Sequence, residues 1–250
     1  MENTLDYQAN SQEKKDDLDT FFDEFMNSRP IFKEKAVLQS NYLPDNIPHR
    51  EDYLKNVAKI LAPALRKERP SNLFIYGKTG TGKSLCVNHV LNKMKNVSIA
   101  REIPLKLVLI NCKLRKVADT EYRILLEILK QLGKEMPSTG ISTNDLYKEL
   151  YDIMDAQKRT VVLVLDEIDA LIKKAGDDIL YNLTRINPEL KSSEVCIVGI
   201  TNDLTVMDSV DARVKSSLNE EEVVFLPYNA MQIQDILRDR SYLAFREGVL

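Results

Sequence analysis

The chain of 250 residues has the length of one large domain, or of one domain with part of another. Hydrophobic residues make up 44% of it, enough for a globular core, and the net charge of −3 argues against uniform coating of nucleic acid. Three widely spaced cysteines, a polar N-terminus and the lack of a long apolar run argue against a disulfide framework, a signal peptide and a membrane span, so a soluble intracellular protein is expected.

Residues 1–28 form an acidic leader, with eight acidic residues against Lys14 and Lys15. Five of its apolar residues are spaced to share one face of a helix, namely Leu18, Phe21, Phe22, Phe25 and Met26. The alternatives are a helix that docks on a partner, a helix that packs on its own domain, and a mostly disordered tail. Because such stripes are usually core, packing on its own domain or a tail is favoured over docking.

Short apolar segments alternate with helical patterns through the rest of the chain. Strands are predicted at 73–76, 107–111, 161–165, 195–200 and 223–226, and helices at 51–68, 85–95, 121–132, 142–157 and 177–186. This alternation favours βαβ units and a parallel sheet.

A complete phosphate-binding pattern follows the first predicted strand. It reads Gly77, Lys78, Thr79, Gly80, Thr81, Gly82, Lys83 and Ser84, and Leu85 continues into a helix. The glycines let several backbone N–H groups converge on phosphate oxygens, and the helix N-terminus adds favourable partial charge. Lys83 is expected to reach the β- and γ-phosphates of ATP or ADP and Ser84 to bind Mg²⁺. A chance glycine-rich turn is the alternative, which the strand and helix on either side disfavour.

Two acidic residues end the predicted strand at 161–165. Asp166 is expected to hold Mg²⁺, and Glu167 to polarise the attacking water as a general base. The alternative is a pair of acids that begin a helix, where the helix dipole favours negative charge. The phosphate loop upstream favours the catalytic interpretation.

Beyond these two motifs, the amino-acid sequence resembles that of a particular group of AAA+ ATPases. The segments that carry the resemblance are 41–44, 48–51, 77–84, 120–125, 165–169, 200–203, 211–218 and 227–230. The chain is similar to the archaeal replication initiators related to the largest origin-recognition subunit and the cell-division-cycle loader of eukaryotes. A generic AAA+ protein would lack His49-Arg50-Glu51 and the Arg-Val-Lys-Ser-Ser-Leu of 213–218.

The resemblance implies an α/β fold, an AAA+ P-loop ATPase with a five-stranded parallel sheet of order 5-1-4-3-2 flanked by helices, plus the beginning of a helical lid. The expected domains are an acidic leader at 1–28, the ATPase base at 29–227 and the start of the lid at 228–250. Family members continue through a full lid and a winged helix. We therefore expect the chain to be truncated, without independent tight binding to DNA.

The resemblance also assigns roles to single residues. Asn202 resembles the sensor-1 residue that contacts the γ-phosphate or orients water, and Arg213 the arginine finger that reaches a neighbouring subunit's nucleotide. Tyr228 and Arg240 are placed to close over the nucleotide, with Asn229 capping the first lid helix. By themselves the two arginines are also typical of a surface ion pair and an exposed helix charge.

The segment before the first helix resembles an adenine site. Leu43 and Pro44 would pack on the base, with His49 and Arg50 nearby, although a lone His-Arg pair is also typical of a structural role. Residues 106–134 hold seven cations against three acids, and in the family an insertion here contacts DNA. A solvated helix face is the alternative.

The expected function is an ATP-binding, slowly hydrolysing and switch-like replication initiator that binds double-stranded origin DNA and helps to recruit the replicative helicase. Related initiator subunits are expected partners through Arg213, and a cytoplasmic, nucleoid-associated location follows. Two alternatives remain open. One is another AAA+ helicase loader or remodelling ATPase acting on protein, and the other is a non-catalytic scaffold that depends on nucleotide.

Overall fold

The computed structural model describes residues 17–39, 42–114, 120–218 and 220–249. The chain divides into two compact units. The larger is Leu43–Asp235, and the smaller combines Met1–Tyr42 with Ile236–Leu250. Within the described residues, no helix has the length and apolar character needed to cross a membrane.

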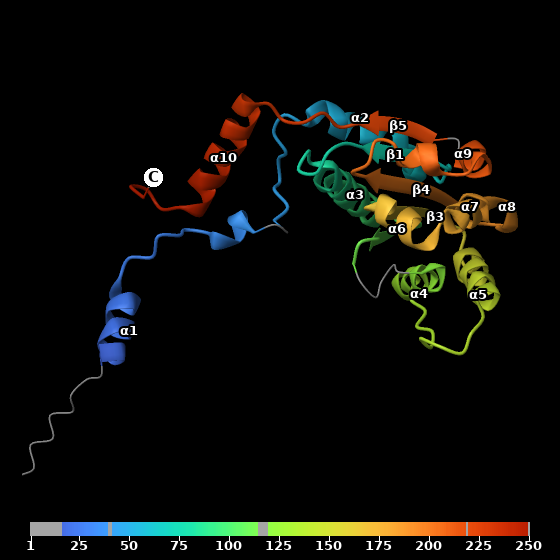
Figure 1. Ribbon diagram of the computed structural model, residues 1–250, viewed down its shortest axis with the longest axis horizontal. Helices are drawn as coiled ribbons and strands as arrows, with labels where there is room; N and C mark the ends of the chain where they lie inside the picture. The colour runs from blue at the N-terminus through green and yellow to red at the C-terminus, as the bar shows by residue number, and fades with distance from the viewer. Residues whose placement is uncertain (1–16, 40–41, 115–119, 219, 250) are drawn as a thin grey trace, which may run out of the picture. The chain divides into compact units, whose positions relative to one another are not determined.

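One parallel sheet forms the centre of the larger unit (Figure 1). Its strands are β1 (Asn72–Tyr76), β2 (Leu105–Asn111), β3 (Thr160–Asp166), β4 (Glu194–Thr201) and β5 (Glu220–Val224). They lie in the order β2-β3-β4-β1-β5, with every neighbouring pair parallel. The predicted fold class and strand order are thereby confirmed.

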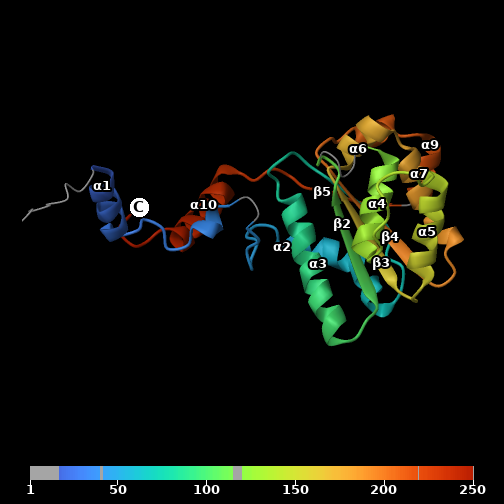
Figure 2. The ribbon, with the colours of Figure 1, turned by 90° about the horizontal axis from the view of Figure 1, so that it is seen from below.

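Helices cover both faces of this sheet. They are α2 (Glu51–Leu61), α3 (Lys83–Ala100), α4 (Glu121–Leu132), α5 (Thr143–Asp155), α6 (Ile168–Ala175), α7 (Asp178–Thr184), α8 (Ile186–Glu189) and α9 (Ala212–Leu218), and α10 (Ala230–Ala244) follows β5. Helices α2 and α3 pack on one face, and α4, α5 and α7 on the other (Figure 2).

The two apolar cores explain the continuous apolar run of β3. Successive side chains of a strand point to opposite faces. Val162 and Val164 accordingly lie in the core with α3, and Val161, Leu163 and Leu165 in the core with α4. A strand covered on both faces needs apolar residues at every position, which confirms the central strand predicted at 161–165.

Several helix boundaries follow from local signals that the sequence carries. Thr120 Oγ1 accepts a hydrogen bond from Arg123 N, and Gly133 ends α4 with φ of 101°. Ser142 Oγ accepts from Asp145 N at the start of α5. At α10 the predicted cap is confirmed, because Asn229 Oδ1 accepts from Gln232 N at 2.9 Å.

Other boundaries differ from the predictions. A single helix was predicted from residue 51 to residue 68. Instead, helix α2 ends at Leu61 and is followed by a 3₁₀ segment, Ala62–Arg66. Pro63 lacks the N–H that an α-helix needs and so favours the tighter turn. The segment predicted as a helix at 177–186 is divided into α7 and α8, and α6 was not predicted.

In the smaller unit, α1 (Asp17–Asn27) forms over the predicted stripe, and none of its residues is buried. Phe21 and Phe25 stack on each other along the exposed face, with ring centroids 6.4 Å apart. Whether the stripe packs on its own domain or docks on a partner stays a prediction.

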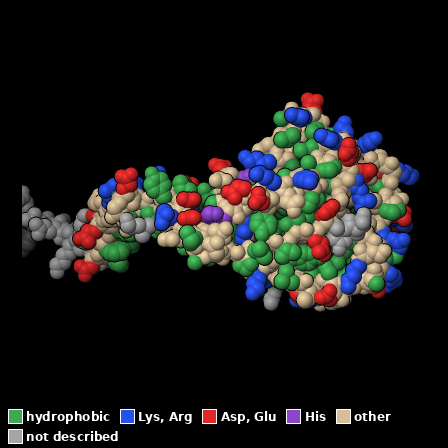
Figure 3. Space-filling view, turned by 90° about the horizontal axis from the view of Figure 1, so that it is seen from above, with side chains coloured by type: hydrophobic (Ala, Val, Ile, Leu, Met, Phe, Trp, Pro, Cys, Tyr) green, Lys and Arg blue, Asp and Glu red, His purple; other side chains and the backbone are tan. Residues whose placement is uncertain are grey.

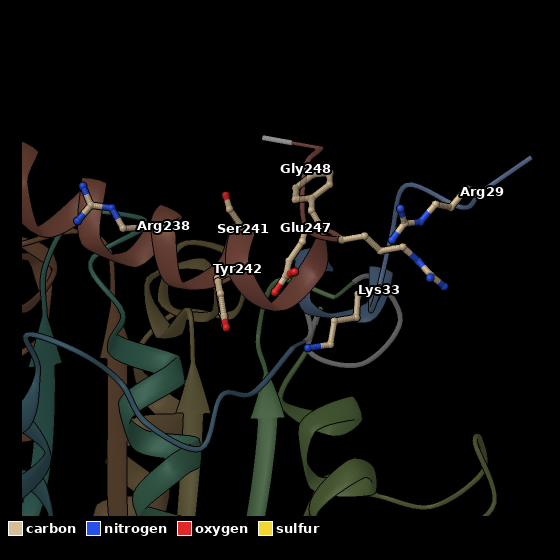
Figure 4. Close-up of a pocket in the computed structure, with 9 residues that line it drawn as sticks. Arg29, Lys33, Arg238, Ser241, Tyr242, Glu247 and Gly248 are labelled. Carbon is tan, nitrogen blue, oxygen red and sulfur yellow. The ribbon is translucent and has the colours of Figure 1, made fainter.

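The rest of the smaller unit joins residues 31–34 to the end of α10. Lys33 N donates to Ala244 O at 2.8 Å, and the rings of Phe32 and Phe245 lie 5.1 Å apart. A cavity of about 600 Å³ lies beside these contacts. The charged residues of its lining are mainly cations, namely Arg29, Lys33, Arg238 and Arg246 against Glu247. Figure 4 labels most of the residues that line it.

Candidate nucleotide-binding site

The predicted phosphate loop follows β1 at the carboxyl edge of the sheet. Gly80 and Gly82 have φ of 82° and 88°, in the left-handed region that glycine tolerates. A Cβ at Gly77 would lie 2.6 Å from Phe225 O, so the backbone itself excludes a side chain there. Lys78 and Thr79 are exposed, whereas Thr81 is buried and donates through Oγ1 to Lys78 O. The loop thus has backbone conformations that its glycines allow and that side chains would hinder.

Lys83 begins α3 and turns its side chain into the loop. Its Nζ donates to Gly77 O at 2.7 Å, to Lys78 O at 3.0 Å and to Asn202 Oδ1 at 2.8 Å. Burial lowers the pKa of Lys83, and the charge of Asp166 offsets part of this shift. The ammonium is therefore held among oxygen acceptors that phosphate oxygens are able to replace.

Ser84 and Asp166 meet where β3 ends. Ser84 donates a side-chain hydrogen bond to the Asp166 carboxylate, which also accepts from Glu167 N at 2.9 Å. Burial is the largest cause of the raised pKa of Asp166, and these hydrogen bonds oppose it. One hydroxyl and one carboxylate thus lie beside the phosphate loop.

This pair fits a magnesium ion better than a metal that needs a dense protein ligand set. Within the described part of the chain, no group of three His, Cys, Asp or Glu residues is arranged to hold a metal. Mg²⁺ commonly takes one or two carboxylates and fills its remaining positions with water and substrate phosphates. Ser84 and Asp166 would supply such a partial set, and their role as magnesium ligands stays a prediction.

Glu167 lies next to Asp166 in a left-handed conformation, with φ of 55°. Its Oε2 pairs with Lys113 Nζ at 3.1 Å, and 26% of its side chain is exposed. Lys113 comes two residues after the end of β2 and was counted in the sequence only as part of a basic stretch. Because β2 lies beside β3, the ends of both strands place the two side chains together.

Asn202 follows β4 at the same edge and contacts Lys83 directly, as described above. Its backbone N donates to Asp169 Oδ1 at 3.4 Å, and Thr201 Oγ1 donates to the same oxygen at 3.1 Å. Asp169 therefore positions the end of β4, a role that sequence reasoning missed. Its place one turn after Asp166, on the same helix start, was the available signal.

Arg213 lies on α9 with 72% of its side chain exposed. Its Nε and Nη2 donate to the two carboxylate oxygens of Asp211, at 3.1 and 3.2 Å. These hydrogen bonds raise the pKa of the guanidinium. The role of an arginine finger stays a prediction, since the structure shows an exposed arginine in a local ion pair.

Arg50 and Tyr228 lie together beside the loop. Arg50 is buried, donating to Thr81 O at 3.0 Å, and its guanidinium carbon lies 3.7 Å from the centroid of the Tyr228 ring. A Cβ added at Gly82 would lie 3.0 Å from Tyr228 Oη. Both residues thus contact or closely approach the phosphate loop, and Arg50 does so by a side-chain hydrogen bond to a backbone carbonyl of the loop.

The remaining predicted contacts stay predictions. His49 Nε2 lies 3.2 Å from Asp235 Oδ2 on α10. Leu43 is 37% exposed and Pro44 half-buried, on the segment that precedes His49. Arg240 is half-buried on the part of α10 that belongs to the smaller unit.

The basic stretch is partly neutralised by its neighbours. Lys113 pairs with Glu167, and Lys134 pairs with Glu149. Arg115 and Lys116 lie outside the described residues. On the face of the molecule in Figure 3, side chains of both charges are interspersed.

Known proteins have sequences similar to that of this chain. The chain matches the family described as AAA domain over residues 66–204. It is 48% identical to an ORC1-type DNA replication protein of Thermococcus onnurineus, over 93% of this chain and 56% of that protein. ORC1-type DNA replication protein 1 of Sulfolobus acidocaldarius is also 48% identical, over 88% of this chain and 54% of its own. The chain thus spans about half the length of the curated relatives it matches.

Solved structures show the same architecture. The Aeropyrum pernix ORC1 protein in complex with DNA is 41% identical, with a TM-score of 0.81 over 88% of this chain and 56% of that one. The Aeropyrum pernix ORC2 protein, solved as ADPNP and ADP complexes, has a TM-score of 0.72 over 87% of this chain and 58% of its own. At 22% identity, the second likeness supports the fold alone.

Proposed function

We propose that this chain, which belongs to the AAA-domain family and is 48% identical to an ORC1-type DNA replication protein, binds ATP with Mg²⁺ and uses the nucleotide to control its binding to origin DNA. The observation that carries the proposal is the contact of Lys83 Nζ with Asn202 Oδ1 at 2.8 Å. It brings the phosphate loop and the end of β4 to one point, where a γ-phosphate would lie between them.

The nucleotide would be held by groups that are already in place. Backbone N–H groups of the loop would donate to the phosphates, and Lys83 would exchange its carbonyl acceptors for phosphate oxygens. Ser84 and Asp166 would bind Mg²⁺, which neutralises charge that develops on the transferring phosphoryl group. Glu167 would accept a proton from the attacking water and Asn202 would orient that water. Slow hydrolysis then acts as a switch, with Arg213 contributing from a related initiator subunit.

The proposal for DNA rests on the relatives. The Aeropyrum pernix ORC1 structure contains DNA, and its likeness covers 88% of this chain. A switch also requires that ATP and ADP bind two conformations with different affinity. Recruitment of the replicative helicase and a nucleoid-associated location in the cytoplasm complete the proposed role.

The nucleotide part is tested by titration with a fluorescent ATP analogue and Mg²⁺. Lys83→Ala removes charge-assisted hydrogen bonds, so the analogue is expected to bind about 10- to 100-fold more weakly. Lys95→Ala, an exposed lysine on the same helix, is the matched control and is expected to bind as the wild type does. Equal affinity in both variants would contradict the proposed site.

The DNA part is tested by footprinting the chain on DNA that flanks its own gene, with ATP and Mg²⁺ present. A discrete protected site is expected, which weakens in Lys83→Ala and persists in Lys95→Ala. Protection that is equal in all three proteins would contradict control by nucleotide. Absence of protection, with ATP binding intact, would contradict DNA binding by this part of the protein.

One observation favours a second candidate, a scaffold that binds nucleotide without hydrolysing it. The Lys113 ammonium holds Glu167, the residue that would otherwise act as the base. In that case Glu167→Gln would leave the turnover of ATP and the footprint unchanged. The switch predicts instead that ATP is trapped and that DNA occupancy changes.

A further inference from the structure

Arg50 is a buried cation with an unusual set of partners. It is 3% exposed and precedes α2 directly. Its Nε donates to Thr81 O at 3.0 Å, and its Nη2 donates to Leu226 O at 2.7 Å. Burying a charge is costly unless it is well paired and hydrogen-bonded. Among the described residues, Arg50 meets this requirement with backbone carbonyls rather than with a carboxylate in an ion pair.

Aromatic rings enclose the guanidinium. Its central carbon lies 3.7 Å from the ring centroid of Tyr228, 5.0 Å from that of Tyr53 and 5.8 Å from that of Phe225. Cations within about 6 Å of a ring centroid are attracted by the electrons of the ring face. A planar guanidinium can stack on a ring while it donates in its own plane, which an ammonium cannot do. The site is therefore specific for arginine.

The groups that Arg50 contacts belong to two functionally different segments. Thr81 is part of the phosphate loop. Leu226 and Tyr228 belong to the segment that leaves β5 and enters α10, within the larger unit. One rigid side chain thus connects the nucleotide site to the beginning of α10.

His49 in the same turn and Tyr53 in the first turn of α2 strengthen this connection. His49, with φ of 62°, places Nε2 3.2 Å from Asp235 Oδ2 on α10. Tyr53 Oη accepts a hydrogen bond from Leu226 N at 3.2 Å. The turn that carries Arg50 therefore contacts the segment from Leu226 to Asp235 at both of its ends.

We propose that Arg50 is a positioning residue that couples the phosphate loop to the segment 226–235, so that nucleotide in the loop changes the state of that segment. The inference rests on the proposed nucleotide binding. Phosphate would compete with Gly77 O and Lys78 O for the Lys83 ammonium and so rearrange the loop carbonyls. A shift of Thr81 O would reach Leu226 through the guanidinium, because one planar group holds both oxygens.

The test is hydrogen–deuterium exchange of the chain, followed by mass spectrometry, with and without ATP and Mg²⁺. In the wild type, nucleotide is expected to slow exchange in peptides from 77–84 and from 226–235 together. At ATP concentrations that saturate each protein, so that weaker binding is compensated, the loop of Arg50→Lys is expected to respond, while the response of 226–235 falls to less than half of that in the wild type. Arg66→Ala, which removes an exposed arginine shortly after α2, is the matched control and is expected to behave as the wild type does.

These outcomes separate coupling from a purely structural role. A purely structural role for Arg50 would speed exchange in both segments but leave the response of 226–235 to nucleotide intact, and that result would overturn the inference. An unchanged response in Arg50→Lys would also overturn it. If ATP does not slow exchange in the peptides from 77–84 of the wild type, the proposed nucleotide binding is itself contradicted, and the coupling that depends on it is contradicted as well.

A second variant keeps the test decisive if Arg50→Lys does not fold. Tyr228→Leu removes the ring that lies closest to the guanidinium while it leaves both carbonyl acceptors in place. The response of 226–235 is expected to weaken, whereas Tyr228→Phe, which keeps the ring, should retain most of it. Equal responses in the two variants would contradict the stacking part of the connection.

Discussion

The carboxyl edge and the amino edge of the same sheet use polar residues in different ways. At the carboxyl edge, polar side chains contact one another: Lys83 contacts Asn202, Ser84 contacts Asp166, and Lys113 pairs with Glu167. Most of these groups are ionisable, and a ligand is able to replace a partner. The edge is thus held together by interactions that binding and chemistry can rearrange.

At the amino edge, polar side chains contact backbone groups. Asn72, at the start of β1, donates to Leu218 O at 2.6 Å and accepts from Ile197 N at 2.9 Å. Asp155 accepts hydrogen bonds from three successive backbone N–H groups, those of Lys191, Ser192 and Ser193. Such hydrogen bonds pair backbone N–H and C=O groups within the protein. These groups are then not available to bind a ligand. Backbone carbonyls also accept from Lys83 and Arg50 at the carboxyl edge, so what distinguishes that edge is the addition of contacts between ionisable side chains, and not polarity alone.

The largest expected effect is on the rate at which two buried cysteines, one near each edge of the sheet, are alkylated. This rate reports how readily each edge opens to solvent. Burial raises the pKa of Cys112, beyond the end of β2, and of Cys196, on β4, to about 12 each. At pH 8 their thiolate fraction, and hence alkylation by iodoacetamide, is expected to be roughly 1000-fold below that of an ordinary cysteine. The rate should rise about tenfold for each pH unit, because only the thiolate reacts. Mass spectrometry of digests measures it, and faster labelling of Cys112 than of Cys196 would show that the carboxyl edge opens more readily.

Glu167→Gln removes the proposed general base at the carboxyl edge while it keeps the size and shape of the side chain. Glu167→Gln is expected to lower ATP hydrolysis about 100-fold or more, with ATP affinity close to that of the wild type. A phosphate-release assay measures the rate, and Glu189→Gln, an exposed acid on α8, is the matched control. Unchanged turnover would favour the scaffold over the switch.

Asn72→Ala, at the amino edge, is expected to lower the stability of the fold without changing the affinity for ATP. It leaves Leu218 O and Ile197 N without their partner, so the free energy of unfolding is expected to fall by about 3 kcal/mol. Urea denaturation measures this, and Asn46→Ala, at an exposed position, should change it little. ATP affinity of the folded fraction should not change. A loss of affinity without loss of stability would abolish the distinction between the edges.

Lys113→Ala sharpens the comparison with the smallest effect. The ion pair with Lys113 occupies the Glu167 carboxylate, which would otherwise be free to accept a proton. Removal of Lys113 is therefore expected to raise the rate of ATP hydrolysis about threefold, because partly exposed ion pairs contribute only a modest free energy. Lys130→Ala, from the same basic stretch, serves as the control. A fall in hydrolysis would instead show that Lys113 assists the reaction.

The sequence by itself determined the parts of this protein that depend on residues close together in the chain. The phosphate loop, the apolar run of β3 with its two acids, and the caps at Thr120, Ser142 and Asn229 were all predictable. Short-range geometry decides such features, because strand alternation, glycine conformations and capping oxygens act within a few residues. The strand order came from the family resemblance and agrees with the structure.

Only the tertiary structure decided which distant side chains meet. The pair of Lys113 with Glu167, the support of Asn202 by Asp169, and the two carbonyls that bind Arg50 all join residues separated by more than 30 positions. Lone charges have no periodicity, so no pattern distinguishes a solvated lysine from one that reaches a neighbouring strand end. Packing of the sheet brings those ends to one edge, and that packing, rather than any local propensity, selects the partners.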